Sequence, residues 1–196
     1  LKELEAIAAA VIGGVILTGA SVETIEEAHI CLKQPGCSSL QIIFNLFRQD
    51  PIWSLFEEAQ ANNVGIIVRL PLASGILTGK FSASHQFHET DHRNFNRDGS
   101  FFSIGETFSG IELSKAVQLT SLFGEFIPEG WTLSDFALRW ILDHEAVSTV
   151  ITGCSDKIQI SQNVRASRLP SLPLISHTRL REIYLSEIKP YIRCPV

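Results

Sequence analysis

The chain has 196 residues, 45% of them hydrophobic, which is enough for one sizeable core, and we expect residues 1–196 to form a single domain. Its formal net charge of −5 argues against a nucleic-acid partner, because nucleic acids recruit basic surfaces. No apolar run approaches the roughly 20 residues of a membrane span, and the acidic start lacks the basic region of a signal peptide. We therefore expect a cytoplasmic protein with no membrane partner.

The cysteine and methionine content narrows the class further. The four cysteines form neither a CxxC pair nor a zinc-ligand spacing, so we expect reduced thiols. The sequence contains no methionine, even at position 1, which we interpret as a processed chain or a fragment.

Helical and strand patterns alternate along the chain. In chain order they predict a helix over 1–10, a strand over 11–18, a helix over 22–33, a strand over 40–44, a helix over 52–61, a strand over 64–70, a long loop over 82–110, helices over 111–126 and 133–143, a strand over 147–152, and helices over 156–165 and 176–189. The expected N-caps of four of these helices are Ser21, Asp50, Thr132 and Ser155. About four strand–helix units predict either a doubly wound sheet or a (β/α)8 barrel, but a barrel needs eight. Half a barrel would leave two open parallel edges.

The most informative stretch is residues 65–81, GIIVRLPLASGILTGKF. The β-branched run over 64–70 predicts a strand buried on both faces. After it come Ser74 and Gly75, small residues that let a ligand approach the backbone, and then the cation Lys80. Such a loop after a buried strand is typical of phosphate binding at strand carboxyl ends. The alternative is an ordinary strand-to-helix connection with its usual small residues.

Five motifs then occur in order over residues 21–196. They are LQIIF with NLF at 40–47, GIIVRLPLASGILTGK at 65–80, HRNFNRDG at 92–99, TLSDFALRWIL at 132–142 and VITGCSDKIQISQN at 150–163. In sequence and spacing the chain resembles the C-terminal half of an aldo-keto reductase. The resemblance implies an α/β fold, a partial (β/α)8 TIM barrel containing about the last four βα units plus the C-terminal helix. It also implies reduction of a small-molecule carbonyl substrate with NADP(H), with NAD(H) as the other option.

The resemblance also implies where the cofactor binds. Ser21 and Gln41 would bind the nicotinamide carboxamide, and Arg69 stands where many members stack an aromatic ring on the nicotinamide. The remaining implied contacts are Leu70, Pro71, Leu72, Ser74, Gly75 and Lys80 around the phosphates, and Gly153, Ser155, Gln159, Gln162 and Asn163 at the adenosine end. The residues support the last group independently, because a helix start offers free N–H groups to an anion and the amides share one helical face. For each amide alone, a solvated surface position is the simpler reading.

Four positions depart from the family pattern. Arg69 can stack on a ring but adds positive charge beside an oxidised nicotinamide. Asp156 and Lys157 stand where NADP-selective members carry an arginine, and they would respectively repel and attract the 2′-phosphate. Val22 replaces an asparagine that helps to bind the carboxamide.

No catalytic residue can be carried over. The family's Asp, Tyr, Lys and His come from the first half of the barrel, and Tyr184 and Tyr191 lie in no matching motif. The chain is therefore either part of a complete reductase, or a non-catalytic dinucleotide-binding regulatory module, or a degenerate fragment that folds poorly or only as a homo-oligomer closing the barrel.

Three other groups of residues invite a function. Histidines and acids in the long loop resemble a metal cluster, namely His85, His88, Glu89, Asp91 and His92. The glycine- and asparagine-rich context favours a plain loop instead. Arg93 and Arg97 would reach a phosphate if this loop closes as a lid, or else be solvated charges. The acid–base trio at 143–145 is expected to face solvent, and Trp53, Trp131 and Trp140 are expected to pack in the core.

Overall fold

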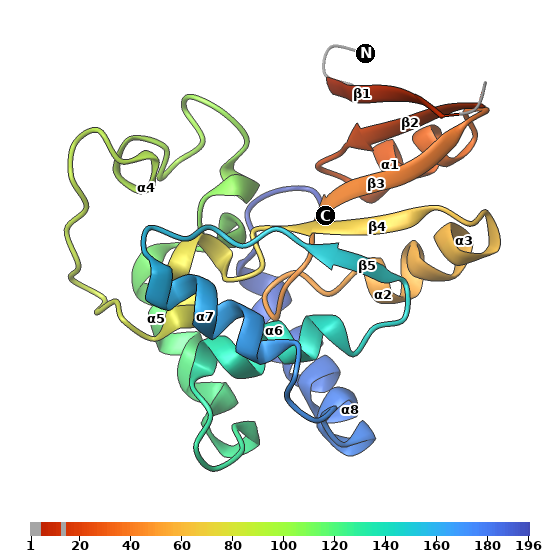
Figure 1. Cartoon of the computed structure of the whole chain (residues 1–196). Helices are drawn as coiled ribbons and strands as arrows, with labels where there is room; N and C mark the ends of the chain where they lie inside the picture. Colours follow the sequence, from red (N-terminus) through yellow and green to blue (C-terminus); the bar gives the residue numbers. More distant parts are fainter. Residues whose placement is uncertain (1–4, 13–14) are drawn as a thin grey trace.

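The computed structural model describes residues 5–12 and 15–196, which fold around one five-stranded sheet (Figure 1). The strands are β1 (Glu5–Ile12), β2 (Val15–Ser21), β3 (Cys37–Ile43), β4 (Gly65–Arg69) and β5 (Val147–Val150). They lie in the sheet in sequence order, with β1 antiparallel to β2 and the next three pairs parallel. Four parallel strands connected through helices confirm the predicted α/β class.

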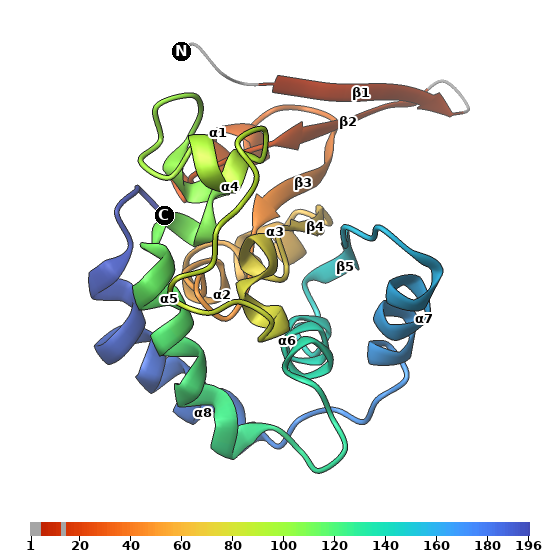
Figure 2. The same cartoon turned by 90° about the vertical axis from the view of Figure 1, so that its left-hand side faces the viewer.

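Helices connect and cover the parallel strands. They are α1 (Ile25–Leu32), α2 (Pro51–Ser54), α3 (Phe56–Ala61), α4 (His92–Phe95), α5 (Leu113–Thr120), α6 (Leu133–Leu142), α7 (Lys157–Ala166) and α8 (Leu174–Ile183). In both views β1 lies at the outer margin of the sheet, and α7 runs beside α6 (Figures 1 and 2). None of the helices in the described ranges has the length and apolar character needed to cross a bilayer.

One face of the sheet forms the core with α6. Leu40 of β3 and Ile66 and Val68 of β4 are fully buried, as are Phe136 and Trp140 of α6. Burial of a large apolar side chain contributes about 1.5–3 kcal/mol, so this layer supplies much of the stability. The expectation that all three tryptophans are core residues is correct for Trp140 and wrong for Trp53, which is 37% exposed beneath the guanidinium of Arg181.

Burial of β4 on both faces was predicted from its unbroken apolar run, and this is wrong. Residues on alternate positions are buried, whereas Gly65, Ile67 and Arg69 are only partly buried by the described residues. The sheet is open, with β1 and β5 as its two edges. The second face of β4 is therefore incompletely covered, as expected of an unclosed barrel.

The N-terminal helix predicted over residues 1–10 is wrong where it can be examined. Residues 5–10 belong to β1, which pairs with β2 from Glu5 opposite Ser21 to Ile12 opposite Val15. Residues 1–4 lie outside the described residues. The predicted strand over 11–18 corresponds to the end of β1 and the start of β2, with 13–14 again outside. An alanine-rich segment has weak periodicity, so pairing with a neighbouring strand decides its structure.

Local hydrogen bonding moves two predicted caps. Thr24, not Ser21, caps α1 and forms a reciprocal capping box with Glu27, because Ser21 is still paired in β2. Asp156, not Ser155, caps α7 by accepting from the Gln159 N–H. Both true caps lie after the predicted residue, where the chain first turns away from the strand or loop.

The other two predicted caps have different outcomes. Thr132 caps α6 in a capping box with Asp135, as predicted. Asp50 precedes Pro51 at the start of α2, but its side chain makes no capping bond. Its carboxylate instead accepts from Tyr184 and Lys189 near the C-terminus.

The later elements follow the predicted order with altered ends. The long loop over 82–110 contains only the short α4 and two 3-10 turns and projects from the body of the fold (Figure 1). The helix predicted over 111–126 is α5 followed by a 3-10 turn, and the helix predicted over 176–189 is α8 followed by one π-helical turn over Tyr184–Ile188. The helix predicted over 133–143 and the strand predicted over 147–152 match α6 and β5 to within two residues.

Asp143 and His144 do not face solvent, contrary to expectation, although Glu145 does. The Asp143 carboxylate accepts from Arg139, from the Leu172 N–H at 2.9 Å and from His177 Nε2 at 3.2 Å, and so joins α6 to α8. His144 donates from Nδ1 to the Trp140 carbonyl at 2.9 Å. The hydrophobic pattern ended at these residues, but packing of α8 covers them.

Burial beside His177 lowers the pKa of His144 to about 4. In the unfolded chain His144 has a pKa near 6.5, so it is protonated more readily there than in the folded chain. The contribution of neutral His144 to the free energy of unfolding is therefore complete above about pH 6.5 and is lost as the pH falls towards 4. For this one group the loss is about 2 kcal/mol between about pH 7 and about pH 5.

Urea unfolding at these two pH values tests the effect. Glutamine is not protonated at either pH. We therefore expect His144→Gln to reduce the difference in the free energy of unfolding between the two pH values by about 1–2 kcal/mol. The matched control is His88→Gln, at an exposed loop position, which should leave the dependence unchanged. Equal slopes in the wild type and His144→Gln would contradict the assignment.

Candidate functional site

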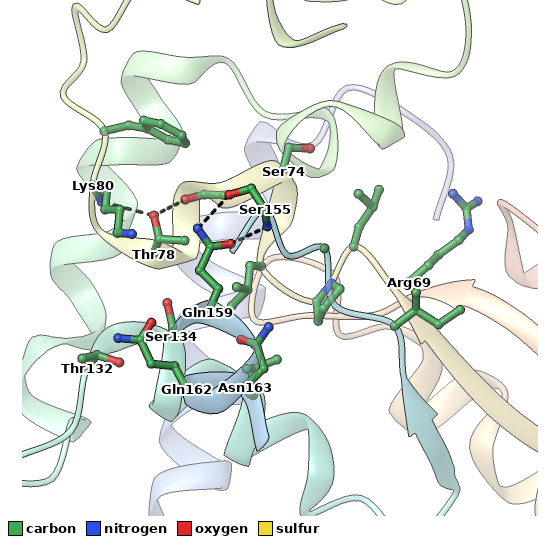
Figure 3. A pocket seen from close by; sticks show the side chains of 18 of the residues that line it. Arg69, Ser74, Thr78, Lys80, Thr132, Ser134, Ser155, Gln159, Gln162 and Asn163 are labelled. Carbon is green, nitrogen blue, oxygen red and sulfur yellow. Dashed lines mark hydrogen bonds between the residues drawn. The ribbon is translucent and has the colours of Figure 1, made fainter. Parts of the chain in front are cut away.

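The candidate site is a pocket of about 660 Å³ at the carboxyl ends of β4 and β5 (Figure 3). All but two of the predicted cofactor residues line it, namely Arg69, Leu70, Pro71, Leu72, Ser74, Gly75, Lys80, Gly153, Ser155, Gln159, Gln162 and Asn163. These residues come from two segments more than 70 positions apart in the sequence, so the fold itself brings them together. The volume lies within the range of small-molecule sites.

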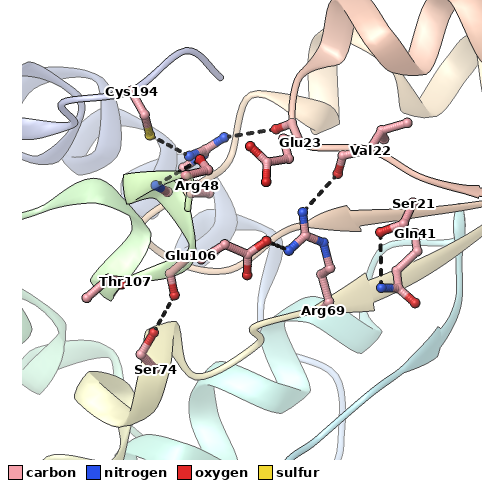
Figure 4. A network of polar contacts seen from close by, with 12 residues as sticks. Ser21, Val22, Glu23, Gln41, Arg48, Arg69, Ser74, Glu106, Thr107 and Cys194 are labelled. Carbon is pink, nitrogen blue, oxygen red and sulfur yellow. Dashed lines mark hydrogen bonds and ion pairs between the residues drawn. The ribbon is translucent and has the colours of Figure 1, made fainter. Parts of the chain in front are cut away.

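The two predicted residues that do not line the pocket are Ser21 and Gln41. They lie opposite one another on β2 and β3, and Gln41 Nε2 donates to Ser21 Oγ at 3.3 Å (Figure 4). The sequence prediction had placed both on one carboxamide. In the structure the two side chains are hydrogen-bonded to each other on adjacent strands of the sheet that also contains Arg69.

One wall of the pocket is a strained loop that follows β4. Leu70, Ala73 and Ser74 all have positive φ angles, of 51°, 48° and 55°. Residues other than glycine rarely adopt this backbone conformation. It costs of the order of 1 kcal/mol or more at each position, and such residues concentrate at functional sites. Ser74 is fixed by its hydroxyl, which donates to the Glu106 carbonyl at 2.8 Å and accepts from the Phe108 N–H at 3.1 Å.

Asn45 stabilises the start of this loop by hydrogen bonding. Its side chain is fully buried, and its Nδ2 donates to the Leu70 carbonyl at 2.8 Å and to Ser109 Oγ at 3.0 Å. Its Oδ1 accepts from the Phe47 N–H at 2.8 Å. One amide therefore connects the end of β3, the loop after β4 and the 3-10 turn that precedes α5.

Arg69 does not project as an isolated charge. Its guanidinium forms an ion pair with Glu106 and donates from Nη2 to the Val22 carbonyl at 3.1 Å (Figure 4). The two side chains are 13% and 23% exposed, so solvent screens the pair only in part. The positive charge that the sequence placed at the end of β4 is compensated within the pocket.

Arg93 reaches the pocket from the long loop. Its guanidinium binds Asp91 through Nε at 2.9 Å and Nη2 at 2.6 Å, and it lies 4.5 Å from the centre of the Phe87 ring. Hydrogen bonding to Arg93 lowers the pKa of Asp91 to about 2. Of the two loop arginines, Arg93 lines the pocket, whereas Arg97 donates to the Arg93 carbonyl at 3.4 Å.

The start of α7 forms the opposite wall. Gln159 folds back so that its Oε1 accepts from the Ser155 N–H at 2.9 Å and its Nε2 donates to Ser155 Oγ at 3.0 Å (Figure 3). Gln162 and Asn163 follow on the same helix. Across the cavity, Lys80 is an exposed cation. The pocket thus offers the N-terminal end of a helix, three amides and one exposed ammonium group.

A separate cluster contains residue types used in acid–base catalysis. Tyr184 donates to Asp50, which also accepts from Lys189. However, Tyr184 is fully buried, and burial together with the Asp50 charge raises the pKa of its phenol. A catalytic tyrosine acid needs the opposite shift, so this cluster connects α2 to the C-terminal segment rather than acting on a substrate.

The described residues include no group of three or more His, Cys, Asp or Glu side chains placed to hold a metal ion. Several residues that line the pocket were not predicted as cofactor contacts, including Phe81, Glu106, Ser134 and Ile151. Glu106 lies in an aperiodic loop, and its role becomes evident only from its contact with Arg69.

The family is decided by comparison with known proteins. A model described as the Aldo/keto reductase family matches residues 5–185 of the chain. The chain belongs to the aldo/keto reductase family. The family is typically NAD(P)H-dependent, and the pocket lies at the strand carboxyl ends, where ligands bind in barrels of this class.

Relatives in the aldo/keto reductase family are longer than this chain. It is 31% identical over 112 residues to an L-glyceraldehyde 3-phosphate reductase of Escherichia coli O157:H7, covering 57% of this chain and 31% of that protein. It is 26% identical over 153 residues to a probable voltage-gated potassium channel subunit beta of Arabidopsis thaliana, covering 74% of this chain and 43% of that protein. The chain therefore matches less than half the length of either relative.

Solved structures agree on the fold. The glycerol dehydrogenase of Gluconobacter oxydans superposes with a TM-score of 0.66 at 22% identity, covering 91% of this chain and 50% of that one. An aldo-keto reductase of Bacillus halodurans in its holo form superposes with a TM-score of 0.58 at 21% identity, covering 83% and 48%. The chain thus has the fold of about half of an aldo-keto reductase barrel.

A double-mutant cycle measures the Arg69–Glu106 pair. We expect Arg69→Ala and Glu106→Ala to show a coupling energy of about 1–3 kcal/mol in urea unfolding, because both groups are mostly buried and in contact. The control cycle uses Arg179 and Glu182, an ion pair whose side chains are 63% and 59% exposed. That pair should couple by about 0.5 kcal/mol or less, and equal coupling in the two cycles would argue against a fixed Arg69–Glu106 contact.

Proposed function

We propose that the chain is the dinucleotide-binding, C-terminal half of an NAD(P)H-dependent aldo-keto reductase acting on small aldehydes or ketones. The observation that carries this proposal is the convergence of residues 69–80 and 153–163 on one pocket. The order of the sequence motifs supports the assignment to the C-terminal half. The name of the Escherichia coli relative supports a small carbonyl substrate.

The pocket has the chemical features that a dinucleotide requires. Lys80 and the N–H groups at the start of α7 suit a pyrophosphate. Gln162 and Asn163 suit a purine, which offers both donors and acceptors on its edge. An anion approaching the Ser155 N–H would displace the Gln159 side chain that now accepts from it.

The Arg69–Glu106 pair suits the nicotinamide end. A guanidinium presents a flat face on which an aromatic ring can stack. With Glu106 bound to it, the added positive charge beside an oxidised nicotinamide is compensated. NAD(P)H would supply the hydride that reduces the carbonyl carbon, and this chain's residues would fix the ring that carries it.

The acid–base groups of the reaction are assigned by this proposal to residues outside the chain. Tyr184, Asp50 and Lys189 are unsuitable, because the phenol is fully buried and its pKa is raised. This chain would therefore bind the cofactor, and other residues would transfer the proton.

A second candidate is a non-catalytic dinucleotide-binding module with a regulatory role. The observation that favours it is the similarity to the probable voltage-gated potassium channel subunit beta of Arabidopsis thaliana over 74% of this chain. A degenerate fragment with no activity of its own is the remaining alternative. Cofactor affinity separates both binding hypotheses from the fragment.

Fluorescence titration of the purified full chain with NADPH and NADH tests cofactor binding. We expect saturable binding, weakened about tenfold in a Gln162→Ala/Asn163→Ala variant, since each lost hydrogen bond contributes about 0.5–1.5 kcal/mol. The matched control is Gln60→Ala, an exposed amide on α3 that does not line the pocket. A folded chain that binds neither nucleotide would overturn the proposal.

The choice between NADPH and NADH depends on two neighbouring charges. We expect Lys157→Gln to lower the NADPH-to-NADH affinity ratio by about fivefold, since one exposed charge contact is worth up to about 1 kcal/mol. Asp156→Asn should raise the ratio by a similar factor, and asparagine keeps the cap of α7. If both variants leave the ratio unchanged, the 2′-phosphate does not approach the start of α7.

A further inference from the structure

A second, smaller cavity lies apart from the candidate cofactor pocket, between α1 and the sheet. It has a volume of about 150 Å³ and is lined by Thr18, Gly19, Ala20, Cys31, Gln34, Pro35 and Cys37. Two of these seven residues are cysteines, and both carry free thiols. Cys31 is 5% exposed, whereas Cys37 is partly exposed and gives access from the surface.

The chain between the two cysteines is a tight, hydrogen-bonded turn. The Gln34 N–H donates to the Cys31 carbonyl at 2.9 Å, and the Cys37 N–H donates to the Gln34 carbonyl at 3.2 Å. The Thr18 N–H holds the turn against β2 by donating to the Gly36 carbonyl at 2.9 Å. The end of α1 and the start of β3 are thus fixed relative to one another, and both cysteines line the same cavity.

The surroundings favour neutral sulfur. Burial raises the pKa of both thiols, and a negative charge on Cys37 raises the pKa of Cys31 further, as expected of neighbouring sulfurs. Both cysteines pack against the hydrophobic core. Thiolates would be desolvated here, which disfavours oxidants and anionic metal–thiolate complexes that need charged sulfur.

We propose that Cys31 and Cys37 form a dithiol site for thiophilic reagents whose bis-thiolate adduct is uncharged, of which trivalent organoarsenicals are the chemical class. An arsenoxide condenses with both thiols. The two As–O bonds of the arsenoxide are replaced by two As–S bonds, and the two S–H protons leave with the oxygen as one water molecule. Arsenic stays trivalent, no electrons are exchanged, and reactants and product are all neutral.

Phenylarsine oxide is the probe, added to the full chain and followed by intact-mass spectrometry. We expect a one-to-one adduct whose mass gain equals the reagent less one water. Because two linked bonds hold the arsenic, glutathione should not remove it, whereas dithiothreitol should. The apparent affinity of Cys31→Ser or Cys37→Ser should fall at least about a hundredfold, since the second bond forms at high effective concentration.

The other two cysteines provide the matched control. A Cys154→Ser/Cys194→Ser variant should retain the full adduct, because neither residue lines this cavity. Loss of the adduct in that variant, or its retention in either single variant, would overturn the proposal. Circular dichroism of each variant establishes that it is folded before its affinity is compared.

Peptide mapping of the unmodified sequence gives an answer that needs no variant. Trypsin cleaves after Lys33, which lies between the two cysteines. A true dithiol adduct therefore keeps the peptides containing Cys31 and Cys37 joined through arsenic after digestion. Finding arsenic on other cysteine peptides, or a binding stoichiometry that glutathione abolishes, would contradict the site.

Discussion

The buried amide of Asn45 is the interaction on which the candidate site depends most. It satisfies the Leu70 carbonyl, contacts Ser109 and accepts from Phe47, and so joins three segments that are distant in sequence. Leu70 begins a loop whose backbone is strained, and such a loop keeps its conformation only where its surroundings impose it. A buried polar group with all its partners specifies one arrangement strongly, because every alternative leaves a polar atom unsatisfied.

Two arginines of the pocket are paired with acids before any ligand is considered. Arg69 is paired with Glu106 and Arg93 with Asp91, and in each case the acid comes from the long loop over 82–110. Ser74 adds a neutral contact to the same loop through the Glu106 carbonyl. Glu106 therefore holds the end of the loop against the pocket by polar contacts rather than by regular secondary structure.

The sequence predicted what depends on local pattern and missed what depends on distant contacts. The strands corresponding to β3, β4 and β5 and the N-cap Thr132 of α6 were predicted correctly, because apolar runs and a threonine before a helical pattern are local signals. The failures have tertiary causes. The residues of β1 pair with a neighbouring strand, and Asp143 is covered by α8, more than 30 positions later. Likewise, the loop after β4 was predicted to bind a ligand and it lines the pocket, but the contact between Arg69 and Glu106 joins residues 37 positions apart.

The contacts of residues 48–50 bear on the order in which the molecule can be completed. Arg48 binds Cys194 and Pro195, Gln49 donates to the Leu180 carbonyl, and Asp50 accepts from Tyr184 and Lys189. These partners lie 131–147 positions later in the sequence. During synthesis the ribosome releases the N-terminal segment first, so Arg48 and Asp50 lack these later partners until residues 180–195 have been made. Residues 48–50, which precede α2, thus acquire these contacts only when residues 180–195 have left the exit tunnel.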